Sequence, residues 1–129
     1  MRPTVDDQDL GKLKRTLHSF GYAMKGIRIG FREETNFQIQ VAMGLASILL
    51  GVYFQLSVVE WLFIFGAIGL VLTTELLNTA LEELCDMLKD THDPHVAKIK
   101  DLAAGAVLCA SLCALVIGLI IFLPKFFAL

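Results

Sequence analysis

The sequence predicts an all-α integral membrane protein, in which three transmembrane helices follow an N-terminal amphipathic helix at the membrane interface. Two observations predict this fold class. Hydrophobic residues make up 56% of the 129 residues and the mean hydropathy is +0.67, which exceeds the usual apolar share of soluble domains. Three apolar stretches, residues 37–54, 61–81 and 102–123, are long enough to cross a bilayer.

We expect residues 1–129 to form a single membrane domain. Residues 1–31 contain no apolar segment of the kind that a cleavable signal peptide requires. The formal net charge is only −2, so there is no electrostatic reason to expect nucleic acid as a partner.

Residues 1–35 carry the pattern of a basic amphipathic helix. Apolar side chains recur at alternating intervals of three and four residues, at Leu10, Leu13, Leu17, Phe20, Met24, Ile27 and Phe31. Basic side chains occupy the remaining surface: Lys12, Lys14, Arg15, Lys25, Arg28 and Arg32. Such a helix next to a membrane span is expected to lie in the cytoplasmic interface. A coiled-coil seam is the alternative, but four glycines, Gly11, Gly21, Gly26 and Gly30, lower the helix propensity.

The basic residues also predict the orientation of the chain. Of the 11 Lys and Arg residues, only Lys125 follows the third stretch, and the link at residues 55–60 has none. The others, including Arg2 and Lys89, precede the first stretch or lie between the second and third. The positive-inside rule therefore places the N-terminus in the cytoplasm and the C-terminus outside.

The second apolar stretch runs directly into a stripe of polar residues. At about 100° per residue, Glu75, Asn78, Glu82, Asp86 and Lys89 fall within an arc of roughly 80°. A charged group near the bilayer centre costs about 2.5–3.5 kcal/mol, so such groups face protein, water or a ligand. A polar seam between packed helices is the simpler interpretation. Several acids on one face favour a site for cations.

Other chemical signals in the chain are weaker. Cys85, Cys109 and Cys113 are odd in number and form no C-x-x-C, which disfavours disulfide and zinc sites. His92 and His95 are spaced like metal ligands, but Asp93-Pro94 predicts a cytoplasmic turn, where we interpret both histidines as solvated loop residues. None of the common nucleotide-binding motifs occurs.

The third stretch follows Lys100 and Asp101 and opens with small residues suited to close helix contact, Ala103, Ala104, Gly105 and Ala106. This opening and the E-x-x-N-x-x-x-E pattern from Glu75 to Glu82 together resemble the prokaryotic diacylglycerol kinase and undecaprenol kinase family. The segment around Gly21-Tyr22 and the later Arg28 and Glu34 are similar to the same family. The resemblance extends from about residue 15 to 123, and the tail at residues 117–125 is more like the undecaprenol branch.

The resemblance implies a homotrimeric, three-span enzyme of the bacterial inner membrane that transfers the γ-phosphate of Mg-ATP to a lipid hydroxyl. By position, Glu75 would accept the hydroxyl proton with support from Asn78, and Glu34 and Glu82 would hold Mg²⁺. The nucleotide site would include Arg15, Tyr22, Glu34, Glu82, Asp86, Lys100 and Asp101. The lipid site would include Ser19, Phe20, Gly21, Tyr22, Ala23, Met24, Arg28 and Glu75. The chain departs from the family pattern at residues 91–95.

This assignment is chemically consistent. Phosphoryl transfer needs in-line positioning, cationic charge on the phosphates and a group that orients the attacking hydroxyl. Glu82 lies about 10 Å along the helix from Glu75, so a metal site near water can adjoin a base just inside the membrane. Three helices cannot bury the polar stripe alone, which favours an oligomer. A proton or cation pathway and a non-enzymatic assembly factor are the alternatives, and neither explains all of these features.

Overall fold

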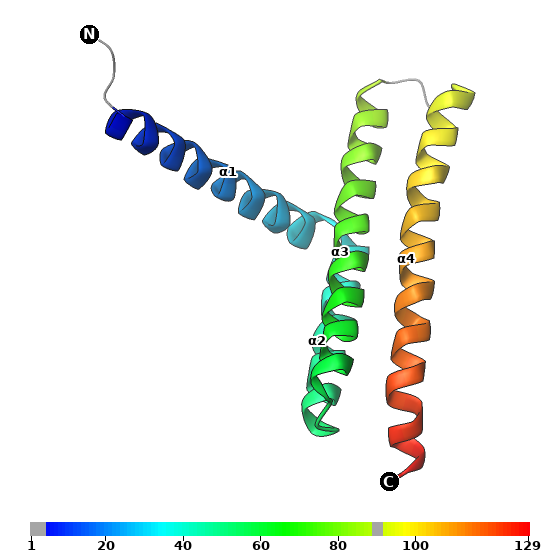
Figure 1. Ribbon diagram of the computed structural model, residues 1–129. Coiled ribbons are helices and arrows are strands. Elements are labelled where there is room, and N and C mark those ends of the chain that lie inside the picture. The colour runs from blue at the N-terminus through cyan, green and yellow to red at the C-terminus, as the bar shows by residue number, and fades with distance from the viewer. Residues whose placement is uncertain (1–4, 89–91) are drawn as a thin grey trace.

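The computed structural model describes residues 5–88 and 92–129. Within these ranges the chain forms four α-helices: α1 (Val5–Glu33), α2 (Thr35–Tyr53), α3 (Val58–Met87) and α4 (Pro94–Phe127). Helices α2, α3 and α4 run antiparallel to their neighbours in the chain, whereas α1 leads away from this bundle (Figure 1). Arg2, Lys89 and Thr91, which entered the sequence predictions, lie outside the described residues.

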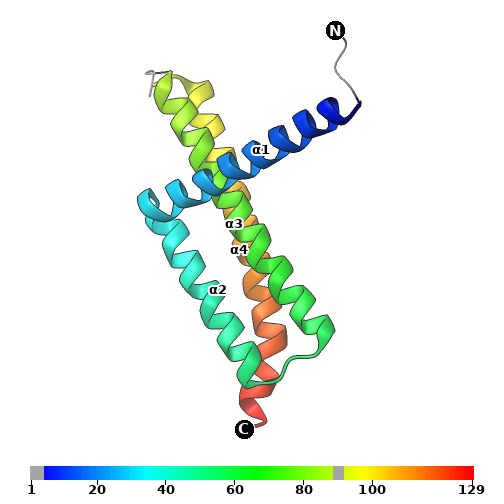
Figure 2. The same ribbon diagram turned by 90° about the vertical axis from the view of Figure 1, so that its left-hand side faces the viewer.

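The prediction of three helices that are long and apolar enough to cross a membrane is confirmed for α2, α3 and α4. The 19 residues of α2 span about 29 Å, close to the thickness of the hydrocarbon core of about 30 Å. Helices α3 and α4, with 30 and 34 residues, are about 45 and 51 Å long. They therefore continue well beyond the predicted stretches, and Figure 2 shows their paired ends extending past the corner between α1 and α2.

The opposite end of the bundle is fixed by the turn at residues 54–57. Ser57 and Glu60 form a capping box that satisfies the first backbone N–H groups of α3. Gly51 permits the close approach here, because a Cβ atom at this position would be 2.7 Å from the Trp61 ring. Lys125 of α4 forms an ion pair with Glu60 at 3.0 Å, which ties the end of α4 to the start of α3.

Helices α3 and α4 pack along two sets of residues spaced by seven. Ile64, Val71, Asn78 and Cys85 are buried or half-buried on α3, and Val96, Ala103, Ala110 and Ile117 are so on α4. A seven-residue spacing keeps one face of each helix toward its partner. Of the small residues predicted to make close helix contact, Ala103 is buried and Gly105 half-buried, whereas Ala104 and Ala106 are exposed. They are exposed because consecutive residues on a helix point about 100° apart.

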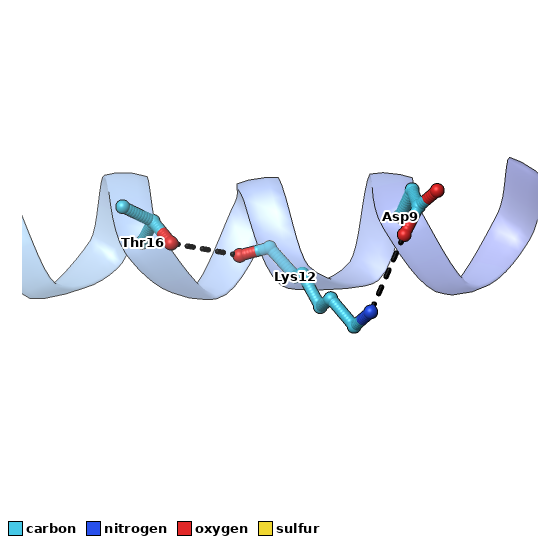
Figure 3. A network of polar contacts seen from close by, with 3 residues as sticks. All are labelled: Asp9, Lys12 and Thr16. Atoms are coloured by element: carbon cyan, nitrogen blue, oxygen red, sulfur yellow. Dashed lines mark hydrogen bonds and ion pairs between the residues drawn. The ribbon is translucent and has the colours of Figure 1, made fainter.

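Helix α1 continues without interruption through Gly11, Gly21 and Gly26, at which a Cβ atom would meet nothing within 4 Å. Its polar side chains bond along the helix itself: Lys12 pairs with Asp9 at 3.4 Å, and the Thr16 hydroxyl donates to the Lys12 carbonyl oxygen at 3.0 Å (Figure 3). The apolar stripe of α1, from Leu10 to Phe31, is exposed. A helix is thus present where it was predicted, and its place at the membrane interface stays a prediction.

Candidate functional site

The carboxylate of Glu75 is buried within the helical bundle. Its residue is only 2% exposed, and Nε2 of Gln40 on α2 donates a hydrogen bond to its Oε2 at 2.9 Å. Glu75 lies about 26 Å along the axis of α3 from Val58, a distance shorter than the thickness of a hydrocarbon core of about 30 Å. A carboxylate at this depth needs a polar partner, and the amide of Gln40 supplies one.

Asn78 and Glu82 form the next level of the polar stripe. Asn78 is 9% exposed, and its Nδ2 donates to Oε1 of Glu82 at 3.2 Å. Oδ1 of Asn78 is buried and has no hydrogen-bond partner among the described residues. Glu82 is half-buried, so its carboxylate is oriented by Asn78 and still reaches the surface. This arrangement suits a carboxylate that binds a ligand arriving from water.

Asp86 and Lys100 join α3 to α4 at the end of the bundle beyond the stripe. Nζ of Lys100 donates to Oδ1 of Asp86 at 2.6 Å, and both side chains are partly exposed. Lys100 is therefore held over the polar face of α3 by a residue of that face. Asp101, which the sequence places beside Lys100 at the mouth of the site, is exposed on α4.

Glu34 occupies the corner between α1 and α2. Its backbone is extended, with φ of −108° and ψ of 108°, and its side chain makes no capping hydrogen bond to α2. The corner follows a contact between α1 and α3, because Gly30 brings the end of α1 onto Leu76. Glu34 is half-exposed, and its carboxylate does not cap α2. The carboxylate is therefore available to a ligand.

The described residues do not form a metal site built from protein side chains alone. Among the described residues, no group of three His, Cys, Asp or Glu side chains is close enough to hold a metal ion. Magnesium differs from zinc in this respect, since it is commonly bound by one or two carboxylates together with substrate phosphates and water. His95 lies in the first turn of α4, rather than in a loop as predicted, because Asp93 caps that helix by accepting from the His95 N–H at 2.7 Å.

The predicted residues of α1 are not brought to Glu75 within one chain. All are exposed, and Figure 1 shows α1 leading away from α3 toward its N-terminus. They are Arg15, Ser19, Phe20, Gly21, Tyr22, Ala23, Met24 and Arg28. The chain thus assembles the α3 and α4 part of the predicted site, with the Glu34 corner beside it, and leaves the α1 part separate.

A cavity of about 330 Å³ lies between α2, α3 and α4, and its lining is mostly apolar. Gln40 lines it, as do Met43 and Gly44 of α2, Ile68 and Leu72 of α3, and Ser111 and Leu115 of α4. Sequence reasoning missed both this cavity and the contact of Gln40 with Glu75. The available signal was the position of Gln40 inside the first apolar stretch, where an amide needs a polar partner.

Comparison with known proteins identifies the family. Residues 21–122 match the family described as prokaryotic diacylglycerol kinase, and this segment extends from the middle of α1 almost to the end of α4. The chain belongs to the prokaryotic diacylglycerol kinase family. Within the matched segment lie Glu34, Glu75, Asn78, Glu82 and Lys100, whereas Arg15 precedes it.

Three relatives in this kinase family illustrate the similarity. The undecaprenol kinase of Bacillus subtilis is 43% identical over 122 residues, which cover 94% of this chain and 99% of that protein. The diacylglycerol kinase of Synechocystis is 37% identical over 114 residues, covering 88% of this chain and 65% of that protein. The diacylglycerol kinase of Escherichia coli K12 is 24% identical over 102 residues, covering 79% of this chain and 84% of that protein. Membership in this kinase family implies a lipid acceptor and ATP with a divalent metal ion.

Proposed function

We propose that this member of the diacylglycerol kinase family transfers the γ-phosphate of Mg-ATP to the hydroxyl of a membrane lipid alcohol. The product is phosphatidate from diacylglycerol or undecaprenyl phosphate from undecaprenol. The observation that carries the proposal is the buried Glu75 carboxylate, which accepts a hydrogen bond from Gln40 in a chain that matches a lipid kinase family. Such a carboxylate is suited to receive a proton from an alcohol that stays in the membrane.

In the proposed reaction the lipid oxygen attacks the γ-phosphorus while the bond from that phosphorus to the β–γ bridging oxygen breaks. The hydroxyl proton passes to the Glu75 carboxylate, and ADP leaves with the electron pair of the broken bond. The transition state is loose, so the hydroxyl proton is lost late and positioning matters more than base strength. Asn78 supports this face of α3 by orienting Glu82.

Glu34 and Glu82 are the proposed ligands of Mg²⁺. A bound Mg²⁺ there would neutralise charge on the nucleotide phosphates. The Glu34 carboxylate makes no capping bond, and that of Glu82 is oriented through Oε1 by Asn78. Two such carboxylates match the usual protein share of a magnesium site in which phosphates supply other ligands. Glu82 lies about 36 Å along α3 from Val58, beyond a hydrocarbon core of about 30 Å, where nucleotide in water has access.

The proposed nucleotide site continues along the extended ends of α3 and α4. Lys100 offers a cation to the phosphates from a position fixed by Asp86, and Asp101 follows on the exposed surface of α4. Arg15 and Tyr22 are the proposed nucleotide contacts from α1, and residues 19–24 with Arg28 are the proposed lipid contacts. Since α1 leads away from α3 in its own chain, we assign these contacts to a homotrimer in which neighbouring copies complete each site.

We propose the bacterial inner membrane as the location, with the N-terminus in the cytoplasm and the C-terminus outside. The distribution of Lys and Arg supports this orientation, and it gives Glu82 and Lys100 access to cytoplasmic ATP. Undecaprenol is the favoured acceptor, because the undecaprenol kinase of Bacillus subtilis matches 94% of this chain at 43% identity. The apolar cavity that Gln40 lines is compatible with the hydrocarbon part of either lipid.

The proposal is tested with purified protein, labelled ATP and each lipid in mixed micelles. We expect magnesium-dependent labelling of the extracted lipid, with undecaprenol turned over faster than diacylglycerol. Glu75→Gln is the matched negative control, since it keeps the shape of the side chain and removes its basicity. Absence of labelled lipid with both acceptors would overturn the proposal, and faster turnover of diacylglycerol would overturn the choice of lipid.

A further inference from the structure

Gln40 is the deepest amide side chain of α2. After it the helix continues with Val41, Ala42 and Met43, and neither Asn nor Gln follows before the helix ends at Tyr53. An isolated polar side chain at this depth is unfavourable unless it has a partner in the protein. The partner is Glu75 of α3, whose Oε2 accepts a hydrogen bond from Nε2 of Gln40 at 2.9 Å.

This hydrogen bond distinguishes the two oxygens of the Glu75 carboxylate, because only Oε2 accepts from Gln40. Hydrogen bonds to a charged acceptor are stronger than those between neutral groups, and they restrict the side-chain torsions of the acceptor. The direction of the amide follows from charge, since a reversed Gln40 would place its own oxygen against a carboxylate oxygen. With Oε2 engaged by Gln40, Oε1 is the carboxylate oxygen that this hydrogen bond does not occupy.

Oε1 of Gln40 supplies a second observation. It is buried and has no hydrogen-bond partner in the described part of the chain, and its residue lines the apolar cavity between α2, α3 and α4. A buried acceptor without a donor is costly, so its retention indicates that the Nε2 bond to Glu75 outweighs that cost. Gln40 therefore connects the cavity, which its side chain lines, to the buried Glu75 carboxylate, to which its Nε2 donates.

We infer that Gln40 is a positioning residue of the kinase reaction, which fixes Oε2 of Glu75 and thereby directs Oε1 toward the lipid hydroxyl. This inference rests on the proposed function of Glu75 as the proton acceptor. It assigns no contact with ATP or the metal to Gln40. Its effect on the rate is exerted entirely through the carboxylate.

The test uses two variants of Gln40 and one matched control. Gln40→Met keeps the length of the side chain and removes the donor, and Gln40→His restores an N–H donor. Gln38→Met is the control, because Nε2 of Gln38 donates at the same distance of 2.9 Å to the Phe31 carbonyl oxygen rather than to Glu75. The kinetic constants kcat and KM for Mg-ATP are measured with the lipid acceptor saturating, together with thermal unfolding in detergent.

We expect Gln40→Met to lower kcat about 10- to 100-fold with KM for Mg-ATP changed less than about threefold, because a positioning bond to a charged group is lost. For Gln40→His, log kcat should recover at least about a third of the decrease seen in Gln40→Met. Gln38→Met should keep kcat within about threefold of the unmodified enzyme. A Gln40→Met enzyme with normal kcat, or one matched in every constant by Gln38→Met, would overturn the inference.

A double-mutant cycle separates this inference from the proposed function. If Gln40 acts through Glu75, Gln40→Met should lower the residual kcat of Glu75→Gln less than about threefold, since the carboxylate is already gone. A full additive loss in that background would show that Gln40 acts by another route. Near-normal turnover of Glu75→Gln alone would instead remove the proposed base. If Glu75→Gln is inactive but Gln40→Met is fully active, only the positioning role of Gln40 is overturned. The two outcomes are therefore distinguishable.

Discussion

Gly30 of α1 and Leu76 of α3 approach so closely that a Cβ atom on Gly30 would lie 2.6 Å from Cδ2 of Leu76. Any residue larger than glycine at position 30 would therefore require the Leu76 side chain to move. The contact places the end of α1, and hence the Glu34 corner, against the turn of α3 that carries Glu75. A packing contact between Gly30 and Leu76 thus holds the end of α1, which leads into Glu34, against the helix that carries Glu75.

Gly30→Val should therefore displace the corner and lower turnover, with a loss of stability of about 1–3 kcal/mol from overpacking. The affinity for Mg-ATP should fall as well, because Glu34 moves with the corner. Turnover, nucleotide binding and thermal unfolding in detergent measure these effects. Gly11→Ala is the control, since a Cβ atom there meets nothing within 4 Å. Leu76→Ala in the Gly30→Val background should restore part of the activity, and failure of any rescue would contradict a role for this contact.

Glu82→Gln should abolish turnover and sharply weaken metal-dependent nucleotide binding while the oligomer stays intact. The amide keeps the bond partner of Asn78 but removes the negative charge that a magnesium ligand supplies. Nucleotide binding is measured over a magnesium titration, and the oligomer by size-exclusion chromatography with light scattering. Glu83→Gln is the matched control, because Glu83 is the exposed neighbour of Glu82. Normal magnesium dependence of the Glu82 variant would remove this residue from the metal site.

Glu75→Gln should lower kcat by about 10²–10⁴-fold, the range expected for a positioned general base. The affinity for Mg-ATP should change little, because the carboxylate acts mainly in the transition state. A loss near the lower end of the range agrees with a loose transition state that needs little base assistance. Steady-state kinetics and equilibrium nucleotide binding on the same preparation give both quantities. Complete loss of Mg-ATP binding by an intact oligomer would move Glu75 into the metal site.

The orientation is tested by cysteine labelling in a background that lacks Cys85, Cys109 and Cys113. A cysteine replacing Ser57 in the α2–α3 turn should react with a membrane-impermeant reagent from outside. Cysteines replacing Lys12 or Asp93 should react only from inside, as the distribution of basic residues predicts. Labelling of position 93 from outside would invert the topology and separate Lys100 from cytoplasmic ATP.

Much of the fold could be predicted from the sequence because the relevant physics is local to each helix. Apolar length determines whether a helix can cross a membrane, and α2, α3 and α4 contain the three predicted stretches. Helical spacing likewise put Glu75, Asn78 and Glu82 on one face of α3, and the structure connects two of them through the bond from Asn78 to Glu82. The ends of α3 and α4 were harder to predict, because their amphipathic extensions are too polar to count as membrane spans.

The sequence by itself determined where each side chain lies along and around the axis of its own helix, and therefore the polar stripe of α3. Only the tertiary structure decided which helix lies opposite that stripe. It paired Gln40 with Glu75 and Lys100 with Asp86, and it placed the Glu34 corner beside α3. The physical reason is that the spacing of residues fixes rotation about one helix axis. The approach of two helices depends instead on how side chains such as Gly30 and Ala103 fit the surface of another helix.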